Sequence, residues 1–326
     1  MARLVIFTSG TLGDHLPYFA LGQALQARGH DVLMVINQAM HAYAERAGLK
    51  AVAVTDIERG PEEARENAWA WDHWRNPWHR AGSHPKAQAQ APGDFVRQVH
   101  ELAALVEGAD LMLATAIRPH GLAAHLISGV PWITISVNPS SFYAPAAPAD
   151  RKRVAASERL FYNAIRPFID RAVREAGGER AVPGWYRGSL WAPRVILGSS
   201  PHFSLPDADF LRPYTSVSQA GFWYWDDPQW AAWQPSAELA AFCTQKPLVL
   251  TFSSQPLEEP RAILQKHVHA AARLDRPLLV QRGWAGFDES DLPPETRPGR
   301  VMFLDYAPHD WLFARASAAI QHGGIG

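Results

Sequence analysis

Cysteine is almost absent from this sequence: Cys243 is the single cysteine in 326 residues. A single cysteine excludes an internal disulfide and fits a reducing compartment. Charge of one sign is also lacking, because the formal net charge is only −1. Bulk electrostatics therefore give no reason to expect nucleic acid binding or a polybasic membrane anchor. The N-terminal apolar run, Leu4 to Phe7, is too short for a signal peptide or a membrane span. We expect a soluble, cytoplasmic protein, and peripheral membrane contact stays open.

Tryptophan, in contrast, is plentiful, with 13 residues. Flat aromatic rings either pack a core or form the wall of a site for a large apolar ligand. The segment 58–93 lacks clean periodicity, and a segment that long between regular elements is usually functional. For the tryptophans in it, ligand contact and packing are equal alternatives, whereas we expect a later group to pack. The first group is Trp69, Trp71, Trp74 and Trp78, and the later group is Trp223, Trp225, Trp230 and Trp233.

Apolar runs typical of buried strands alternate with helical patterns along the chain. Arg3 to Thr8 has a strand pattern, Leu16 to Arg28 a helical one, and His30 to Ile36 a second strand pattern. This order gives parallel sheets with right-handed crossovers. The alternation continues to residue 137 and resumes at residue 248, after a segment at 205–236 rich in Pro, aromatic residues and Asp.

We therefore expect an α/β protein with two doubly wound, Rossmann-like domains facing a cleft. The expected boundaries are residues 1–212 for the N-terminal domain, 213–236 for a linker and 237–326 for the C-terminal domain. The chain ends in the turn His322-Gly323-Gly324-Ile325-Gly326, so we expect the second domain to be incomplete. Glycines let a turn adopt positive φ and bring its amide groups close to an anion, which predicts a phosphate-binding loop.

Motifs in both halves resemble the family 1 glycosyltransferases, which have the GT-B fold. The segment Gly10 to Gly22 has the form G-x-x-G-D-x-x-P, as in sterol and macrolide glucosyltransferases and in rhamnosyltransferases. Thr251 to Ser254 and Gln281 to Trp284 are also similar to this family. The most specific match is Asp305 to Phe313 followed by the glycine-rich turn. The resemblance covers the whole chain in order.

The resemblance implies a hexosyltransferase that moves a sugar, expected to be glucose, from a UDP- or dTDP-linked donor to an acceptor hydroxyl with inversion. In such enzymes the N-terminal domain holds the acceptor and the C-terminal domain the donor. No metal and no further cofactor are expected. The Trp-rich segment favours a bulky apolar acceptor such as a sterol, a polyketide or a lipid. The alternative function is a truncated, non-catalytic protein that only binds the acceptor.

Asp14 is the expected catalytic base, because it occupies the family position three residues before Pro17. A general base in hydrogen-bond reach of the acceptor hydroxyl contributes roughly 10²–10⁴-fold to the rate. The alternative role for Asp14 is to N-cap the helix that follows. His15 is the rival base, since its ordinary pKa of about 6.5 suits proton transfer. In relatives with a His base, an acid on a later strand orients the imidazole, but here Leu111 to Thr115 is followed by Ala116, Ile117 and Arg118.

The expected donor contacts lie in the second half. His322 resembles the family residue that binds the diphosphate, and Tyr306 stands where relatives stack a ring on the base. The full set is Ser253, Ser254, Arg282, Gly283, Trp284, Tyr306, Ala307, Pro308, His309, His322, Gly323 and Gly324. The expected acceptor contacts are Gly13, Trp69, Trp71, Trp74, Trp78 and His120.

Family members continue past the glycine-rich loop with a helix and an acid–Gln pair that holds the sugar. We therefore expect a fragmentary reading frame, a portion of a longer chain, or a chain that associates with a missing piece. A nicotinamide-dependent oxidoreductase fits less well. The first loop lacks the third glycine of G-x-G-x-x-G, and Asn37 and Gln38, rather than an acid, follow the second strand.

Overall fold

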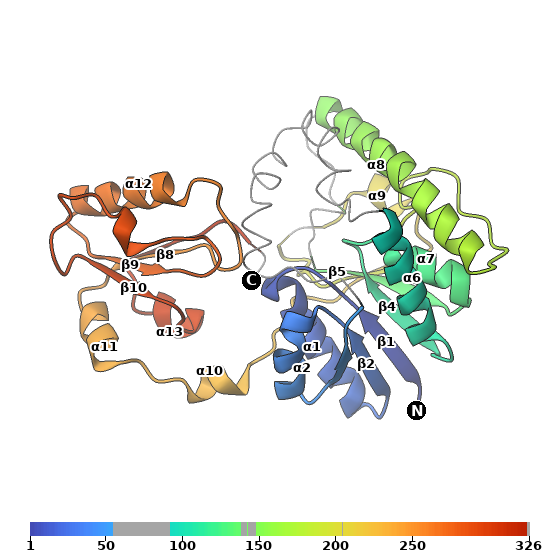
Figure 1. Ribbon diagram of the computed structural model, residues 1–326, viewed down its shortest axis with the longest axis horizontal. Coiled ribbons are helices and arrows are strands. Elements are labelled where there is room, and N and C mark those ends of the chain that lie inside the picture. The colour runs from blue at the N-terminus through green and yellow to red at the C-terminus, as the bar shows by residue number, and fades with distance from the viewer. Residues whose placement is uncertain (55–91, 138–141, 143–147, 204, 325–326) are drawn as a thin grey trace. The chain divides into compact units, whose positions relative to one another are not determined.

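A computed structural model describes residues 1–54, 92–137, 142, 148–203 and 205–324 (Figure 1). The described residues up to Trp225 form one compact unit, named unit 1 here, and those from Asp226 to Gly324 form unit 2. Each unit is built on a parallel sheet with helices on its faces, which confirms the α/β expectation.

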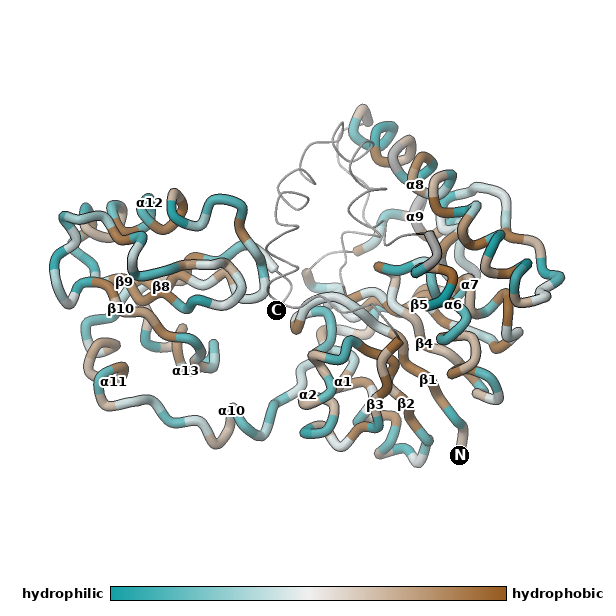
Figure 2. Tube along the Cα trace, in the orientation of Figure 1, coloured by the Kyte–Doolittle hydropathy of each residue, from teal (hydrophilic) through white to brown (hydrophobic). Residues whose placement is uncertain are grey.

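Unit 1 contains a seven-stranded parallel sheet in the order β3-β2-β1-β4-β5-β6-β7. The central strands are apolar and buried on both faces, as parallel strands covered by helices must be. In Figure 2 the hydrophobic colour accordingly follows strands such as β1 and β2. The strands are β1 (Arg3–Phe7), β2 (Asp31–Val35), β3 (Lys50–Val52), β4 (Leu111–Thr115), β5 (Trp132–Ser136), β6 (Arg194–Leu197) and β7 (Ser216–Gln219).

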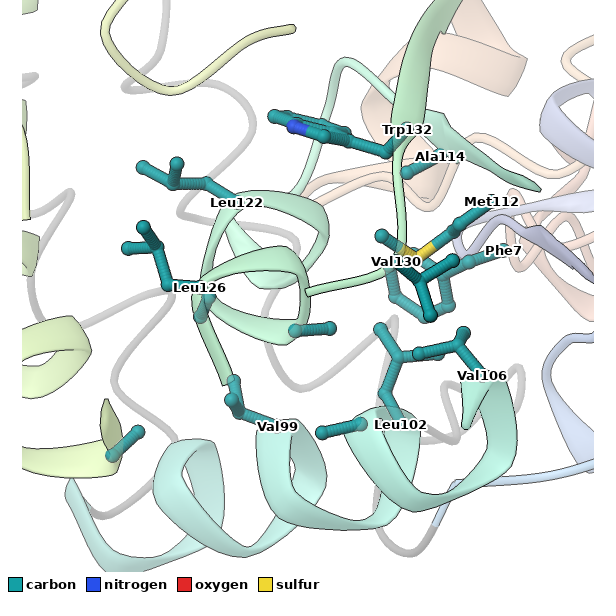
Figure 3. Close-up of a cluster of buried hydrophobic side chains, with 14 of the residues drawn as sticks. Phe7, Val99, Leu102, Val106, Met112, Ala114, Leu122, Leu126, Val130 and Trp132 are labelled. Atoms are coloured by element: carbon teal, nitrogen blue, oxygen red, sulfur yellow. The ribbon is translucent and has the colours of Figure 1, made fainter. Parts of the chain in front are cut away.

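Alternate residues of these strands enter two separate cores. Phe7, Met112 and Ala114 point to one face, where they pack with Val99, Leu102 and Leu122 (Figure 3). Ile6 and Leu113 point to the other face and pack with Tyr18 and Phe19. The first face is covered by α6 (Pro92–Val106), α7 (His120–Ser128) and α8 (Pro148–Glu175), and the second by α1 (Leu12–Ala27) and α2 (His41–Arg46).

Unit 2 repeats the arrangement on a four-stranded parallel sheet in the order β10-β9-β8-β11. Helix α12 (Pro260–Arg273) covers one face, and α11 (Ala237–Cys243) and α13 (His309–Phe313) cover the other. The strands are β8 (Leu248–Thr251), β9 (Leu278–Gln281), β10 (Val301–Leu304) and β11 (Ala318–Ile320). The remaining short helices of the described residues are α9 (Ala208–Leu211) and the 3-10 helix η1 (Gln38–Met40) in unit 1, and α10 (Pro228–Ala232) and the 3-10 helix η3 (Glu289–Asp291) in unit 2.

Two details differ from the sequence expectations. The segment expected as a linker from residue 213 contributes β7 to the first sheet, pairing Val195 with Val217, and the two units divide after Trp225. Strand β7 is short and alternates in burial, so its pattern does not stand out among the neighbouring prolines and aromatic residues. Helix α1 begins at Leu12 rather than at Leu16, because Thr11 caps it. The later tryptophans pack as expected: Trp225 lies edge-on to Phe19, with ring centroids 5.3 Å apart.

Candidate active site

Both sheets reverse their strand order at one point. In unit 1 this switch point lies between β1 and β4, and in unit 2 it lies between β8 and β11. Open α/β sheets bind ligands just beyond the carboxyl ends of the strands at such a point, because the two following connections diverge to opposite faces. The sequence candidates Asp14, Ser253 and His322 stand in the loops or helix starts that follow β1, β8 and β11. The fold therefore places each of them at a switch point.

Asp14 is fixed at the start of α1 by a capping box. Thr11 is the N-cap residue and Asp14 the third helical residue, so the alternative N-cap role of Asp14 is wrong by three positions. The backbone N–H and the hydroxyl of Thr11 donate to Asp14 Oδ2 at 2.8 and 3.1 Å. Gly10, with φ 130°, lies so close that a Cβ there would stand 2.4 Å from Asp14 Oδ2. One carboxylate oxygen is thus held by the loop.

Arg118 is the charged neighbour of Asp14. It follows β4, and its Nε–H donates to Ser9 Oγ in the β1–α1 loop at 2.9 Å. Burial raises the pKa of the Asp14 carboxyl, while its hydrogen bonds with Thr11 and the charge of Arg118 oppose that rise. A carboxyl with a raised pKa is a stronger base than an exposed aspartate, while the Thr11 hydrogen bonds and the Arg118 charge favour its ionised form.

His15 is entirely buried. Its Nδ1 lies 2.8 Å from the Thr11 carbonyl oxygen, which can only accept, so Nδ1 carries the proton and Nε2 the lone pair. Burial lowers the pKa of His15 to about 4, and its Nε2 has no hydrogen-bond partner among the described residues. The imidazole is therefore neutral and inaccessible to solvent here, which favours Asp14 over His15 as the base.

His120 is buried in the core between the first sheet and α6 and does not lie on a binding surface. It is 2% exposed, contacts Gln98 Oε1 through Nε2 at 2.9 Å, and packs against Phe7 and Phe95. The expectation of an acceptor contact at His120 is therefore corrected, because the first turn of α7 points this ring into the core. Gly13 differs: nothing lies within 4 Å of where its Cβ would be. Trp69, Trp71, Trp74 and Trp78 lie outside the described residues.

A cavity of about 100 Å³ opens beside Arg118. Its walls come from the segment after β4, from α8 and from the connection at 184–191. Tyr186 and Ile117, 49% and 41% exposed, stand at its surface. The aromatic residues of the wall were not singled out as binding residues from the sequence, because their aromatic pattern is that of an ordinary core. The lining includes Ala116, Ile117, Arg118, Glu158, Phe161, Trp185, Tyr186, Arg187 and Trp191.

In unit 2, loops after β8 and β9 interlock. Ser253 has φ 51°, and its carbonyl oxygen accepts from the Trp284 amide at 2.7 Å. Gly283 passes so close that a Cβ there would stand 2.1 Å from that oxygen. Beneath them lie the neighbouring residues Thr251 and Gln281, which are buried and whose side-chain oxygens have no described hydrogen-bond partner. The sequence places both in family-like motifs but assigned neither a binding role, although polar residues closing apolar strands were the available signal.

The glycine-rich turn follows β11 at the same edge. The His322 ring approaches the Phe252 ring, with centroids 6.3 Å apart, and its Nε2 lies 2.3 Å from where a Cβ would be at Gly324. The imidazole is thus folded over its own glycines, which any larger residue at Gly324 would prevent. Partial burial lowers the pKa of His322. Gly323 adopts φ 79° and has open space around it.

The remaining donor candidates follow β9 and β10. Arg282 already pairs with Glu289 at 2.7 Å and Asp305 at 3.6 Å, so its charge is offset. Tyr306 is 44% exposed, with its ring 6.5 Å from that of Trp230. Ala307 and Pro308 are buried and can offer only backbone groups. The His309 ring stacks on Phe313, with centroids 4.8 Å apart. Ser254 is partly buried beside Ser253.

We compared the chain with known protein families, curated proteins and solved structures. No family model matches the sequence. An O-mycaminosyltylonolide 6-deoxyallosyltransferase of Streptomyces fradiae is 28% identical over 99% of this chain and 76% of its own length. A sterol 3-beta-glucosyltransferase of Debaryomyces hansenii is 23% identical over 99% of this chain. The chain spans only 21% of that larger protein's length.

Solved structures agree on the fold. The glycosyltransferase of kitacinnamycin superposes over 100% of this chain and 76% of its own, with TM-score 0.63 and 19% identity. The glycosyltransferase VinC in complex with dTDP covers 99% of this chain and 77% of its own, with TM-score 0.55 and 18% identity. Two parallel α/β units with acidic and glycine-rich loops at their switch points define a GT-B glycosyltransferase. The chain has the GT-B fold and is similar to glycosyltransferases of the macrolide and sterol glucosyltransferase type.

No helix in the described part of the chain is long and apolar enough to cross a membrane. Within the same residues, no group of three or more His, Cys, Asp or Glu side chains is arranged to hold a metal ion.

Proposed function

We propose that the protein transfers a sugar, with inversion, from a nucleotide diphosphate donor to a hydroxyl of a bulky apolar acceptor. The observation that carries this proposal is the partly buried Asp14 carboxylate at the switch point of unit 1, held by Thr11 with Arg118 nearby. UDP- and dTDP-glucose are the proposed donors. A sterol, polyketide or lipid is the proposed acceptor class, and the chemistry needs no metal.

In this scheme Asp14 takes the acceptor hydroxyl proton while that oxygen attacks the anomeric carbon. The bond from this carbon to the diphosphate oxygen breaks on the opposite face, which inverts the centre. The leaving diphosphate gains negative charge, and amide groups of Gly323 and Gly324 with the His322 imidazole are the proposed donors of hydrogen bonds to it. Tyr306, exposed at the same edge of the sheet, is the proposed stacking partner of the base.

Donor binding and turnover test the proposal separately. Titration calorimetry with UDP, UDP-glucose and dTDP-glucose should show saturable binding that His322→Ala weakens at least about tenfold, the size of a lost charge-assisted hydrogen bond. His269→Ala, which removes an exposed imidazole on α12, is the matched control and should leave the affinity unchanged.

Asp14→Asn should reduce turnover of an apolar acceptor by roughly 10²–10⁴-fold while donor affinity stays near that of the wild type. Asp31→Asn, at an exposed aspartate paired with Lys50, is the control. Unchanged turnover in Asp14→Asn would remove Asp14 from the mechanism. Donor or acceptor binding without any turnover by the wild-type chain would instead favour the acceptor-binding alternative.

A further inference from the structure

The cavity beside Arg118 has a specific relation to the proposed base. It begins at Ala116, directly after β4, and Asp14 follows β1, the neighbouring strand across the switch point. Arg118 lines the cavity, bonds to Ser9 in the β1–α1 loop and acts electrostatically on Asp14. A molecule seated in the cavity would therefore lie next to the loop that carries the base. This inference rests on the proposed function.

The walls of the cavity are aromatic and held in place. Trp191 donates from Nε1 to the Ala116 carbonyl at 3.0 Å, and its ring packs on Phe142 with centroids 5.1 Å apart. Ser189 is buried, and its hydroxyl accepts from the Tyr186 amide at 2.8 Å, which fixes the connection. At about 100 Å³ the cavity is smaller than the ~150 Å³ cavity that holds benzene in an engineered protein. It has room for part of one ring, and its open side leaves the rest of a ligand outside.

The charges lining the cavity already balance one another. Glu158 and Arg187 form an ion pair at 3.4 Å with side chains 29% and 21% exposed, and the charge of Arg118 interacts with that of Asp14. An anion entering here would lose its hydration next to guanidinium groups that carboxylates already offset. A cation would meet several arginines, and Arg159 already lies over the Trp185 ring at 5.4 Å, where a cation would otherwise bind.

We propose that this cavity is the acceptor subsite and that it takes an uncharged ring of the acceptor. The Glu158–Arg187 pair sets this preference, because it makes the polar side of the cavity neutral. Flat aromatic walls provide the contact area, and the hydroxyl that receives the sugar stays on the Arg118 side, towards the β1–α1 loop. Acceptors that would insert a carboxylate or an ammonium group at this position are excluded by the same balance.

Three small single-ring probes test the charge preference directly. Phenol, benzoate and benzylamine carry charges of zero, minus one and plus one near pH 7. We expect ligand-observed NMR titrations with the full 326-residue chain to show phenol binding at least about tenfold more tightly than either ion. Equal or tighter binding of benzoate or benzylamine would overturn the proposal.

Two variants assign the binding to this cavity. Ala116→Phe places a ring into the cavity and should abolish phenol binding, with circular dichroism and a thermal melt confirming that the chain folds. Glu158→Gln keeps the side-chain size and removes the negative charge beside Arg187, so benzoate affinity should rise about tenfold while phenol affinity stays constant. Phenol binding that persists in a folded Ala116→Phe, or benzoate affinity unmoved in Glu158→Gln, would contradict the assignment.

These titrations need no donor and no turnover. If the subsite exists but the chain transfers no sugar, the probes still bind with the expected preference and only the proposed function fails. If the chain transfers sugar and Ala116→Phe leaves the KM for the acceptor unchanged, the acceptor sits elsewhere and only the subsite fails.

Discussion

At the scale of single residues, the charge next to the base decides how that base works. A histidine base gains from an acid beside it, because the acid stabilises the protonated imidazole. Here the proposed base is Asp14, and the neighbouring group after β4 is Arg118, so the charges of base and partner are both reversed. A nearby cation favours the ionised form of a partly buried aspartate, as the Thr11 hydrogen bonds also do. The presence of Arg118 instead of an acid after β4 therefore agrees with an aspartate, rather than a histidine, after β1.

Arg118→Gln should move the acid limb of the pH profile of kcat/KM to higher pH. Burial raises the pKa of Asp14 and Arg118 lowers it, so removing the guanidinium raises that pKa further. The base works only when unprotonated, and activity would therefore be lost sooner as the pH falls. Initial rates across the acidic range measure this shift.

Two controls separate charge from structure in this experiment. Arg118→Lys keeps the positive charge and should keep the limb in place. Ser9→Ala removes the hydrogen bond at 2.9 Å but not the charge, and should also leave the limb in place. A limb that moves equally in Ser9→Ala would show that loop position, not the Arg118 charge, sets the pKa of Asp14.

At the scale of elements, close backbone contacts between the loops after β8 and β9 hold the proposed donor site. Gly283 and Gly299 both adopt positive φ, 51° and 73°, but only Gly283 faces a close neighbour, the Ser253 carbonyl oxygen. Gly299 therefore serves as a control that carries the conformational effect alone. The difference between the two variants gives the contribution of the close approach at Gly283 to stability and to UDP binding.

Gly299→Ala should lower the free energy of unfolding by about 1 kcal/mol, the cost of a non-glycine residue at positive φ. Gly283→Ala should lower it by more and also weaken UDP binding, because its Cβ would push Ser253 away from the β8 edge. Urea unfolding and calorimetry on both variants measure this. Equal stability and equal UDP affinity for the two variants would contradict the claim that the contact between Gly283 and Ser253 holds these loops together.

At the scale of the whole molecule, buried neutral histidines should make folding sensitive to mild acid. Burial lowers the pKa of His15 to about 4 and that of His120 to about 3. Below the ordinary pKa of about 6.5, the unfolded chain gains protons that the folded chain does not. Each histidine then lowers the free energy of unfolding by up to about 1.4 kcal/mol per pH unit as the pH falls towards its folded pKa.

His120→Gln should make this loss shallower between pH 6.5 and 5, a window above the ordinary carboxyl pKa values. Urea titrations at several pH values give the slope. The same replacement at exposed His269 should leave the slope of the wild type, and identical slopes in both variants would mean that His120 is not the neutral group responsible.

Much of the fold could be predicted because its signals are local. The strand patterns expected at Arg3 to Thr8 and His30 to Ile36 match β1 and β2 to within one residue at each end, since short apolar runs between turn residues mark buried strands. Strand β7 was missed, because four residues of alternating burial among prolines give almost no periodic signal. The Trp-rich segment falls outside the described residues, so its predicted contact with an apolar ligand stays a prediction.

The sequence by itself determined the α/β alternation, the family and the loops that carry Asp14 and His322, because each depends on residues close together in the chain. The tertiary structure decided which candidates share surroundings. Arg118 reaches Ser9 across 109 positions, His15 and His120 are buried by helices and strands from elsewhere, and the cavity joins α8 to the end of β4. Burial and charge pairing arise only when distant segments pack, and they set which side chain can act as a base.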